Sequence, residues 1–267
     1  MVMTSVEESV RTVSRAGETS ISYTVSGPPE GPTWVYVHGW GCRRTDFAAV
    51  AAFLPAEHRV IAVDLAGHGD STSTRTDWTM AEFARDVAAV IDAESVERCA
   101  VVGHSLGGAV AVELARLRPD VVTQVIGLDS FHYLGLYPAI EDGAARGLLQ
   151  TFEDDFPAGV RSLVVMGSVP DTDPEFGETI FAKMSSIAPA VGTGALAEML
   201  RWDMDEALDA VPHPVATLAV RGLLDPVAPE RYGDRIDFVV HELGSHHFLL
   251  EQPEETAKLL MAARTTE

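Results

Sequence analysis

The fold is decided by the stretch Gly103-His104-Ser105-Leu106-Gly107-Gly108, which places a serine between glycines. Residues 99–102 before it form a short apolar run that ends in two valines, which predicts a buried strand. Residues 107–117 after it have the apolar pattern of a helix, and Pro119 ends that pattern. A serine on so tight a strand-to-helix turn must take a strained backbone conformation, which lifts its hydroxyl clear of the sheet. The stretch therefore predicts an exposed nucleophile at Ser105.

The same turn also supplies a donor for an oxyanion hole. The first N–H groups of a helix have no acceptor within it, so the Leu106 N–H can stabilise a developing oxyanion. A second donor is expected from the loop Val37-His38-Gly39-Trp40-Gly41-Cys42, because its glycines let the backbone approach a substrate closely. We assign that role to the Trp40 N–H and expect the Trp40 indole to form part of the pocket wall. His38 is expected to brace this loop rather than to transfer a proton.

The rest of the chain alternates short apolar strands with helical stretches. Two alternating runs, 10–14 and 21–25, predict an opening hairpin with its turn at residues 16–18. Further strands are predicted at 34–37, 59–63, 99–102, 122–128, 215–220 and 238–241, and helices at 46–53, 80–93, 107–117 and 253–263. Strands separated by helices in this way are typical of a parallel sheet covered on both faces. We therefore predict an α/β protein with a doubly wound, mostly parallel, eight-stranded sheet.

The alternation stops after residue 129. Between residues 130 and 212 the sequence has short helical patterns broken by Gly and Pro, for example at 178–186 and 194–204, and no strand alternation. An insertion of that length in a regular α/β chain is typical of an active-site lid. We predict a core domain formed by residues 1–129 and 213–267, with a helical lid at 130–212 inserted after the sixth strand.

Composition and charge limit the partners. The 267 residues are 46% hydrophobic and 22% charged, as in soluble globular proteins, and the formal net charge is −21. Nucleic acids and anionic membrane surfaces repel so acidic a chain, which excludes both and favours a small, mainly apolar substrate. No apolar run reaches the roughly 18 residues of a membrane span, and residues 1–8 do not resemble a secretory signal, so we expect a cytoplasmic protein.

The two cysteines, Cys42 and Cys99, form no disulfide framework. Cys99 falls within a predicted core strand, where a cysteine acts as a small buried hydrophobe. No Cys/His spacing in the sequence resembles a zinc site. We therefore expect neither a metal nor a cofactor.

A serine hydroxyl needs a neighbouring base, and the base needs an acid to orient it. The chain supplies candidates in the order nucleophile, acid, base, in loops that follow strands whose carboxyl ends meet at one crevice. The expected base is His246, which follows the last strand, with His247 packing beside it. The preferred acid is Asp225, just past the next-to-last strand. Asp129, which ends the strand before the insertion, is the alternative acid.

Five motifs in this order resemble those of the α/β-hydrolase superfamily, and the resemblance covers nearly the whole chain. They are the loop His38-Gly39-Trp40-Gly41, the loop Asp64-Leu65-Ala66-Gly67-His68-Gly69-Asp70-Ser71, the serine turn at 103–107, the acid turn at 222–225 and the histidine loop at 246–253. In that family the histidine commonly stands five residues before an acid and seven before a proline, a spacing that His246, Glu251 and Pro253 satisfy. The resemblance implies the α/β-hydrolase fold and a serine, histidine and acid triad.

The resemblance also implies an activity. The His-Gly-Trp-Gly loop is similar to that of lid-bearing carboxylesterases such as the pimeloyl-carrier-protein methyl esterases. A dehalogenase or epoxide hydrolase of this fold is expected to carry aspartate where Ser105 stands, so those activities are set aside. We expect a serine esterase that cleaves an ester, thioester or lactone through an acyl-enzyme. Its substrate is expected to contact the residues His38, Trp40, His104 and Phe131.

Two other functions stay open. The cofactor-free quinolone dioxygenases of the same superfamily take their acid from the strand end where Asp129 stands. In that case a His246 and Asp129 dyad would deprotonate a heteroaromatic ring, and Ser105 would only bind it. The superfamily also includes small-molecule sensors, so a weakly catalytic receptor is the third hypothesis.

Overall fold

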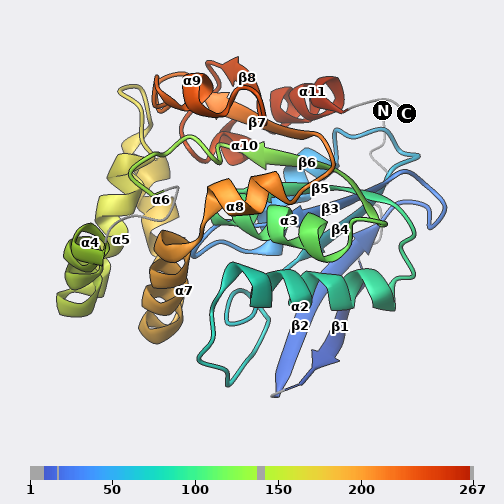
Figure 1. Ribbon diagram of the computed structural model, residues 1–267, viewed down its shortest axis with the longest axis horizontal. Coiled ribbons are helices and arrows are strands. Elements are labelled where there is room, and N and C mark those ends of the chain that lie inside the picture. Colours follow the sequence, from blue (N-terminus) through green and yellow to red (C-terminus); the bar gives the residue numbers. More distant parts are fainter. Residues whose placement is uncertain (1–8, 17, 137–141, 265–267) are drawn as a thin grey trace.

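Eight strands form a single sheet in the computed structural model, which describes residues 9–16, 18–136 and 142–264 (Figure 1). The strands are β1 (Ser9–Arg15), β2 (Thr19–Ser26), β3 (Thr33–Val37), β4 (Arg59–Val63), β5 (Cys99–His104), β6 (Val122–Leu128), β7 (Val215–Val220) and β8 (Asp237–His241). Their order across the sheet is β1-β2-β4-β3-β5-β6-β7-β8. β2 is antiparallel to β1 and β4, and all the later pairs are parallel. The predicted fold class is confirmed.

Helices cover both faces of this sheet (Figure 1). One face carries α2 (Met80–Ala93) and α3 (Leu106–Leu117), and the other carries α1 (Ala48–Ala51), α10 (Phe248–Glu251) and α11 (Pro253–Ala263). The helix predicted at 46–53 is instead a 3-10 turn, η1 (Arg44–Phe47), followed by α1. Neither α10 nor α9 (Ala228–Tyr232) was predicted, because such short helices are too brief to show an apolar period.

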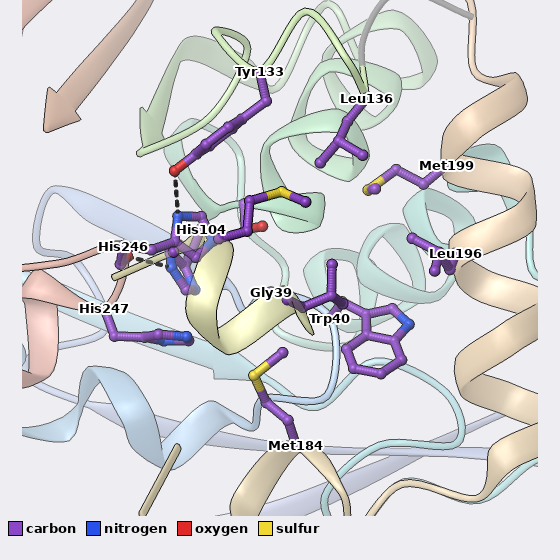
Figure 2. Close-up of a pocket in the computed structure, with 14 residues that line it drawn as sticks. Gly39, Trp40, His104, Tyr133, Leu136, Met184, Leu196, Met199, His246 and His247 are labelled. Atoms are coloured by element: carbon purple, nitrogen blue, oxygen red, sulfur yellow. Dashed lines mark hydrogen bonds between the residues drawn. The ribbon is translucent and has the colours of Figure 1, made fainter. Parts of the chain in front are cut away.

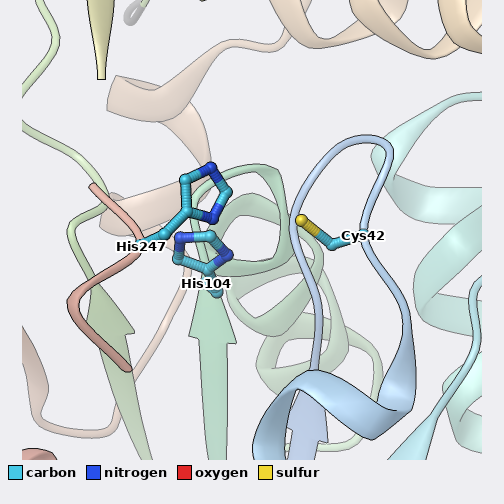
Figure 3. A group of neighbouring side chains, drawn as sticks. All are labelled: Cys42, His104 and His247. Carbon is cyan, nitrogen blue, oxygen red and sulfur yellow. The ribbon is translucent and has the colours of Figure 1, made fainter. Parts of the chain in front are cut away.

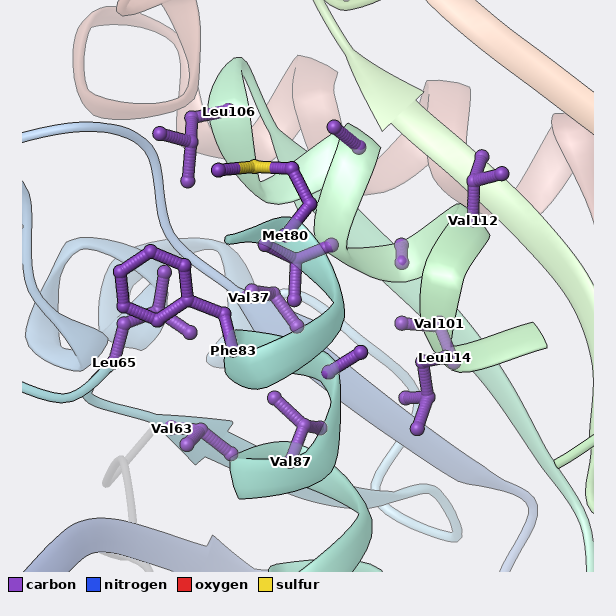
Figure 4. Packing of buried hydrophobic residues seen from close by; sticks show 14 of the residues in the cluster. Val37, Val63, Leu65, Met80, Phe83, Val87, Val101, Leu106, Val112 and Leu114 are labelled. Atoms are coloured by element: carbon purple, nitrogen blue, oxygen red, sulfur yellow. The ribbon is translucent and has the colours of Figure 1, made fainter. Parts of the chain in front are cut away.

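The central strand β3 shows how the sheet is buried on both sides. Its side chains alternate between the two faces, as those of any strand do. Val35 and Val37 belong to the hydrophobic cluster under α2 and α3, whereas Trp34 and Tyr36 belong to the cluster under α1, α10 and α11. Figure 4 shows part of the first of these clusters, which includes Phe83 of α2 and Leu65. A continuous apolar strand is therefore the expected pattern, and it is what residues 34–37 have.

The described residues between β6 and β7 form five helices, namely α4 (Asp142–Asp154), α5 (Phe156–Met166), α6 (Pro174–Met184), α7 (Pro189–Arg201) and α8 (Met204–Asp209). The described part of this stretch has no strand, as predicted. Asp155, Asp173 and Asp203 start three of these helices by accepting backbone N–H groups, and proline in the first turn favours α5, α6 and α7. Helices α4 to α7 stand together beside the sheet, and α8 returns along α3 (Figure 1). We refer to residues 142–209 as the helical segment.

None of the helices in the described residues is by itself both long enough and apolar enough to span a membrane. Helices α6 and α7 meet these two requirements by length and composition only when taken together, and they are bent by 100° at their junction.

The serine turn depends on a close approach between α3 and β3. A Cβ atom added to Gly107 would lie 2.2 Å from the Val37 carbonyl oxygen and 2.6 Å from the His38 carbonyl oxygen. Both neighbours are backbone atoms, which cannot rotate away. Gly107 is therefore required by packing, although glycine is a poor helix former.

Changing Gly107 to Ala is expected to lower the free energy of unfolding by about 1–3 kcal/mol or more, because the added methyl group overpacks the contact with β3. The matched control is Gly147→Ala in the middle of α4, where an added Cβ meets no atom within 4 Å. There we expect stabilisation by about 0.5–1 kcal/mol from helix propensity alone. Denaturant unfolding of both variants measures the two effects, and equal signs would contradict the packing argument.

Candidate active site

Ser105 stands at the N-terminus of α3 in a strained conformation. Its φ is 53° and its ψ is −121°, in a region that L-residues rarely adopt. The backbone N–H of Ser105 donates to the Leu128 carbonyl at 3.1 Å, which ties the turn to the end of β6. The predicted strained turn is therefore present. Strain of this kind persists only where the surrounding structure enforces it, and it is common at reactive side chains.

Ser105 lines a small pocket. Figure 2 shows the side chains of other residues that line it, including Trp40, Tyr133 and His246. The cavity volume of the pocket is about 60 Å³. The residues around Ser105 are Gly39, Trp40, His104, His246 and His247, and the opposite wall is formed by Tyr133, Leu136, Leu163, Met166, Gly167, Met184, Leu196 and Met199. That opposite wall comes from the loop after β6 and from helices α5, α6 and α7. The helical segment and the sheet therefore enclose an apolar site.

The structure brings His246 against Asp129. The His246 Nδ1 atom lies 2.7 Å from Asp129 Oδ2. Asp129 is fully buried, and its carboxylate also accepts from His132 Nε2 at 2.8 Å, from the Val220 N–H at 2.9 Å and from the Tyr133 hydroxyl. Burial by itself would raise the pKa of Asp129, but the hydrogen bonds and charge interactions of His132 and His246 hold that pKa well below its usual range. The carboxylate is therefore ionised and aimed at the histidine.

The preferred acid of the sequence analysis, Asp225, lies elsewhere and does not orient His246. Its side chain is half-buried, and its Oδ1 atom accepts the Val227 N–H at 2.9 Å. Its carbonyl oxygen accepts the Ala228 N–H at 3.0 Å. Asp225 therefore closes the turn that leads into α9, which is a common task for an aspartate in a loop. The position beside the histidine is occupied by the alternative acid, Asp129.

Tyr133 is a site residue that sequence reasoning missed. Its hydroxyl donates to Asp129, and its oxygen lies 3.0 Å from His246 Nδ1 (Figure 2). Tyr133 also lines the pocket. The only signal in the sequence is the placement of His132 and Tyr133 three and four residues after Asp129, which is not a recognised motif. Both side chains fold back onto the carboxylate because Asp129 and Phe131 have positive φ values of 48° and 71°, which turn the chain sharply.

The predicted oxyanion donors, Trp40 and Leu106, flank Ser105. A Cβ added to Gly39 would lie 3.1 Å from Ser105 Cβ, which shows how closely the loop before Trp40 approaches the serine. Among the described residues, neither the Trp40 nor the Leu106 backbone N–H has a backbone acceptor. The Trp40 indole lines the pocket as predicted, and its Nε1 donates to the Gly192 carbonyl of α7 at 2.8 Å. The two predicted donors therefore lie beside Ser105.

Of the remaining residues expected to contact substrate, only His104 lines the pocket. Its Nε2 lies 2.9 Å from the His246 carbonyl oxygen, and burial lowers its pKa to about 3. Phe131 is fully buried away from the pocket, where a Cβ on Gly108 would lie 3.0 Å from its ring. The sharp turn at Asp129 directs the Phe131 ring under α3 instead of upward into the pocket, so the expected contact is wrong.

His38 is also fully buried and lies outside the pocket lining. Its Nδ1 donates to the Gly39 carbonyl at 2.8 Å, and its Nε2 accepts the Leu65 N–H at 2.9 Å. These two bonds define the neutral tautomer and join the loop after β3 to the loop after β4. Burial lowers the pKa of His38, which keeps it neutral. The bracing role predicted for His38 is found, and the substrate contact is not.

Changing His38 to Ala is expected to lower the free energy of unfolding by at least about 1–3 kcal/mol, because the buried Leu65 N–H loses its acceptor. Chemical denaturation of the purified variant measures this cost. The matched control is Asp225→Ala, which removes a bond to a partly exposed turn and should change stability by less than about 1 kcal/mol. A His38→Ala protein as stable as the parent would show that the loop needs no brace.

Comparison with known proteins adds a family and several relatives. A family model described as "Alpha/beta hydrolase family" matches residues 34–259. A protein of Neisseria meningitidis named pimeloyl-[acyl-carrier protein] methyl ester esterase is 31% identical over 245 residues, which covers 86% of this chain and 92% of that protein. A protein of the same name from Aliivibrio salmonicida is 29% identical over 89% of this chain and 93% of its own length.

Solved structures show the same fold. A thermophilic esterase from Thermogutta terrifontis has a TM-score of 0.81 and 24% identity, and it covers 96% of this chain and 97% of its own. Est816, described as an N-acyl homoserine lactone degrading enzyme, has a TM-score of 0.81 and 23% identity over 95% of this chain and 100% of its own. The likeness extends through both the sheet and the helical segment.

Proposed function

Because the chain belongs to the alpha/beta hydrolase family, we propose that it is a serine hydrolase that cleaves the ester, thioester or lactone bond of a small, mainly apolar substrate. The observation that carries the proposal is the juxtaposition, in one apolar pocket, of Ser105 on its strained turn and His246 held by a buried carboxylate. The relatives whose names describe esterases support the same reaction class.

The reaction follows from this geometry. The Asp129 carboxylate engages His246 Nδ1, which leaves Nε2 as the basic nitrogen. Nε2 takes the proton of the Ser105 hydroxyl while the serine oxygen attacks the carbonyl carbon. The N–H groups of Trp40 and Leu106 stabilise the oxyanion. The tetrahedral intermediate collapses to an acyl-enzyme and expels the alcohol, which receives the proton from His246. Water then attacks the acyl group by the same steps and releases the acid and free Ser105.

Asp129 is suited to this role because it cannot be neutralised easily. Its low pKa keeps the carboxylate charged across the ordinary pH range, and its burial excludes water from the bond to His246. The hydroxyl of Tyr133 and the Nε2–H of His132 hold both carboxylate oxygens in place. Because these donors already hold the carboxylate in place, its surroundings need little rearrangement when the imidazole becomes charged, and the free-energy cost of that step is small.

We further propose that residues 130–212 act as a lid over the core domain. Their helices supply most of the apolar side of the pocket, including the three methionines Met166, Met184 and Met199. A cavity of about 60 Å³ holds only a few water-sized molecules, so a larger substrate requires the helical segment to move away from Ser105. Methionine side chains adapt easily to different apolar groups.

Changing Ser105 to Ala is expected to lower kcat/KM for ester hydrolysis by roughly 10⁴-fold or more, and Asp129→Asn should cost a similar factor because the neutral amide favours the wrong histidine tautomer. Asp225→Asn is the matched control and should change kcat/KM by less than about 3-fold, since Asp225 only closes a turn. Steady-state kinetics with p-nitrophenyl esters measure all three. Greater loss in Asp225→Asn than in Asp129→Asn would refute the assignment of the acid.

The pocket volume predicts a preference for short acyl groups. We expect kcat/KM to fall from p-nitrophenyl butyrate to p-nitrophenyl decanoate by at least about 10-fold, because the longer chain must displace the helical segment. Leu163→Ala widens the pocket wall and should reduce that ratio, mainly through KM for the longer ester. Val165→Ala, on the same helix with an exposed side chain, is the control. An unchanged ratio in Leu163→Ala would contradict the closed pocket.

One observation favours a second function. The bond between His246 and Asp129 is the dyad implied by the resemblance to cofactor-free dioxygenases of heteroaromatic rings. In that reaction His246 would remove a ring proton and Ser105 would only bind the substrate. The two functions differ in Ser105, so labelling by a fluorophosphonate probe distinguishes them. Rapid labelling of the folded protein, lost in Ser105→Ala, supports the hydrolase. Oxygen uptake with a hydroxyquinolone that survives Ser105→Ala supports the dioxygenase.

A further inference from the structure

Three buried side chains with metal-binding atoms gather beside the pocket. Cys42, His104 and His247 each offer one ligand atom, and these atoms all lie within 4.8 Å of one another. Figure 3 shows both imidazole rings and the thiol directed toward a common point. The three residues come from the loop after β3, the end of β5 and the loop after β8. Their spacing in the sequence gave no sign of this, because tertiary structure alone brings them together.

The hydrogen bonds of the two histidines leave nitrogen lone pairs available. His104 Nε2 lies 2.9 Å from the His246 carbonyl, so it carries the proton and Nδ1 carries the lone pair. A backbone carbonyl on the far nitrogen is the usual outer partner of a metal-binding histidine. His247 Nδ1 is buried and has no hydrogen-bond partner in the described residues. Such an orphaned buried nitrogen is costly in a folded protein unless a ligand engages it.

Burial keeps the imidazoles of the cluster neutral and its thiol protonated. Burial lowers the pKa of His104 to about 3 and that of His247 well below its usual range. Burial raises the pKa of the Cys42 thiol, and Asp46 beside it contributes to that rise. Lys183, which pairs with Asp46 at 2.7 Å, acts in the opposite direction on the thiol. The thiol is therefore protonated without an ion, and binding of an ion would have to release that proton.

We propose that Cys42, His104 and His247 form a binding site for a thiophilic divalent cation of the zinc type. A thiolate with two imidazoles is a donor set that zinc prefers, and zinc sites with three protein ligands keep a fourth position for water or substrate. In tetrahedral zinc, bonds of about 2.0–2.3 Å set neighbouring ligand atoms about 3.5 Å apart. Side-chain rotations of the order of an ångström would bring the cluster to that spacing. His104 and His247 line the pocket, so the fourth position faces it.

Occupancy has a consequence for the reaction. An ion bound there would connect two loops. Cys42 lies in the loop after β3, and His247 lies in the loop that carries His246. His104 in turn bonds the His246 carbonyl. The ion would hold these groups in one arrangement beside the catalytic imidazole, and its fourth ligand position would face the pocket that receives the substrate. We therefore expect the ion to inhibit the proposed hydrolysis, a consequence that rests on the proposed function, whereas binding itself does not.

Binding is tested with Co²⁺ as a spectroscopic probe on reduced, tag-free protein. The parent is expected to bind one Co²⁺ with a thiolate-to-metal charge-transfer band, to release about one proton per ion, and to lose the band when Zn²⁺ is added. Cys42→Ser should abolish the band and weaken Zn²⁺ binding at least 100-fold. Cys99→Ser is the matched control, because Cys99 is also buried but belongs to no cluster of ligands in the described residues. It should bind as the parent does.

His247→Gln serves as a second variant in case Cys42→Ser does not fold, and it should also lose the band. Absence of a charge-transfer band in the parent, or a band that persists in Cys42→Ser, would overturn the site. Inhibition is measured separately by adding Zn²⁺ to the parent, Cys42→Ser and Cys99→Ser during ester hydrolysis. Inhibition of the parent and Cys99→Ser alone supports the consequence, and equal inhibition of all three refutes it. A parent with no hydrolysis refutes the proposed function and leaves the binding result standing.

Discussion

The buried carboxylate of Asp129 connects the chain after β6, the end of β7 and the loop after β8 at one side of the pocket. It ends β6, accepts the N–H of Val220 at the end of β7, and bonds His246 in the loop after β8. The side chains of His132 and Tyr133 close over it at the start of the chain that leads into the helical segment. Burying an unpaired charge would cost several kcal/mol of folding free energy or more. The donors to Asp129 therefore stabilise the arrangement of the chain around the ends of β6 and β7. The constraint that folds this corner is also the one that orients the histidine.

Burial controls the electrostatics of the site more than the net charge of the chain does. Although the formal charge is −21, desolvation keeps two histidines that line the pocket, His104 and His247, neutral. Neutral imidazoles can act as metal ligands, whereas charged ones would repel each other across the 5.1 Å that separates the ring centres of His104 and His247. Because the same burial leaves the His104 and His247 rings uncharged, these side chains and Cys42 can lie close together.

The loop after β3, which contains His38, Gly39 and Trp40, contacts three other parts of the structure. His38 anchors it to the loop after β4, Trp40 reaches α7 through its indole, and Gly39 allows contact with the serine turn. The indole bond to Gly192 connects the helical segment to the loop that is proposed to supply an oxyanion donor. Movement of that segment would thus reach the reaction centre by a direct hydrogen bond, which gives a physical basis for a lid that affects chemistry as well as access.

Local sequence patterns determined the strands, the helices α2, α3 and α11, the strained turn at Ser105 and the loops that carry Trp40 and His246. These features depend on neighbouring residues, whose apolar period and glycine placement are visible in the chain itself. Two aspartates were candidates for the acid, with Asp225 preferred from the sequence and Asp129 as the alternative, and only the tertiary structure places one of them, Asp129, beside His246. The chain turns sharply at Asp129 and brings its carboxylate to His246, whereas Asp225 is used by the turn before α9. The roles of Tyr133, Phe131 and the cluster of Cys42, His104 and His247 were likewise decided by long-range contacts, because side-chain direction after a turn is set by packing and not by spacing in the sequence.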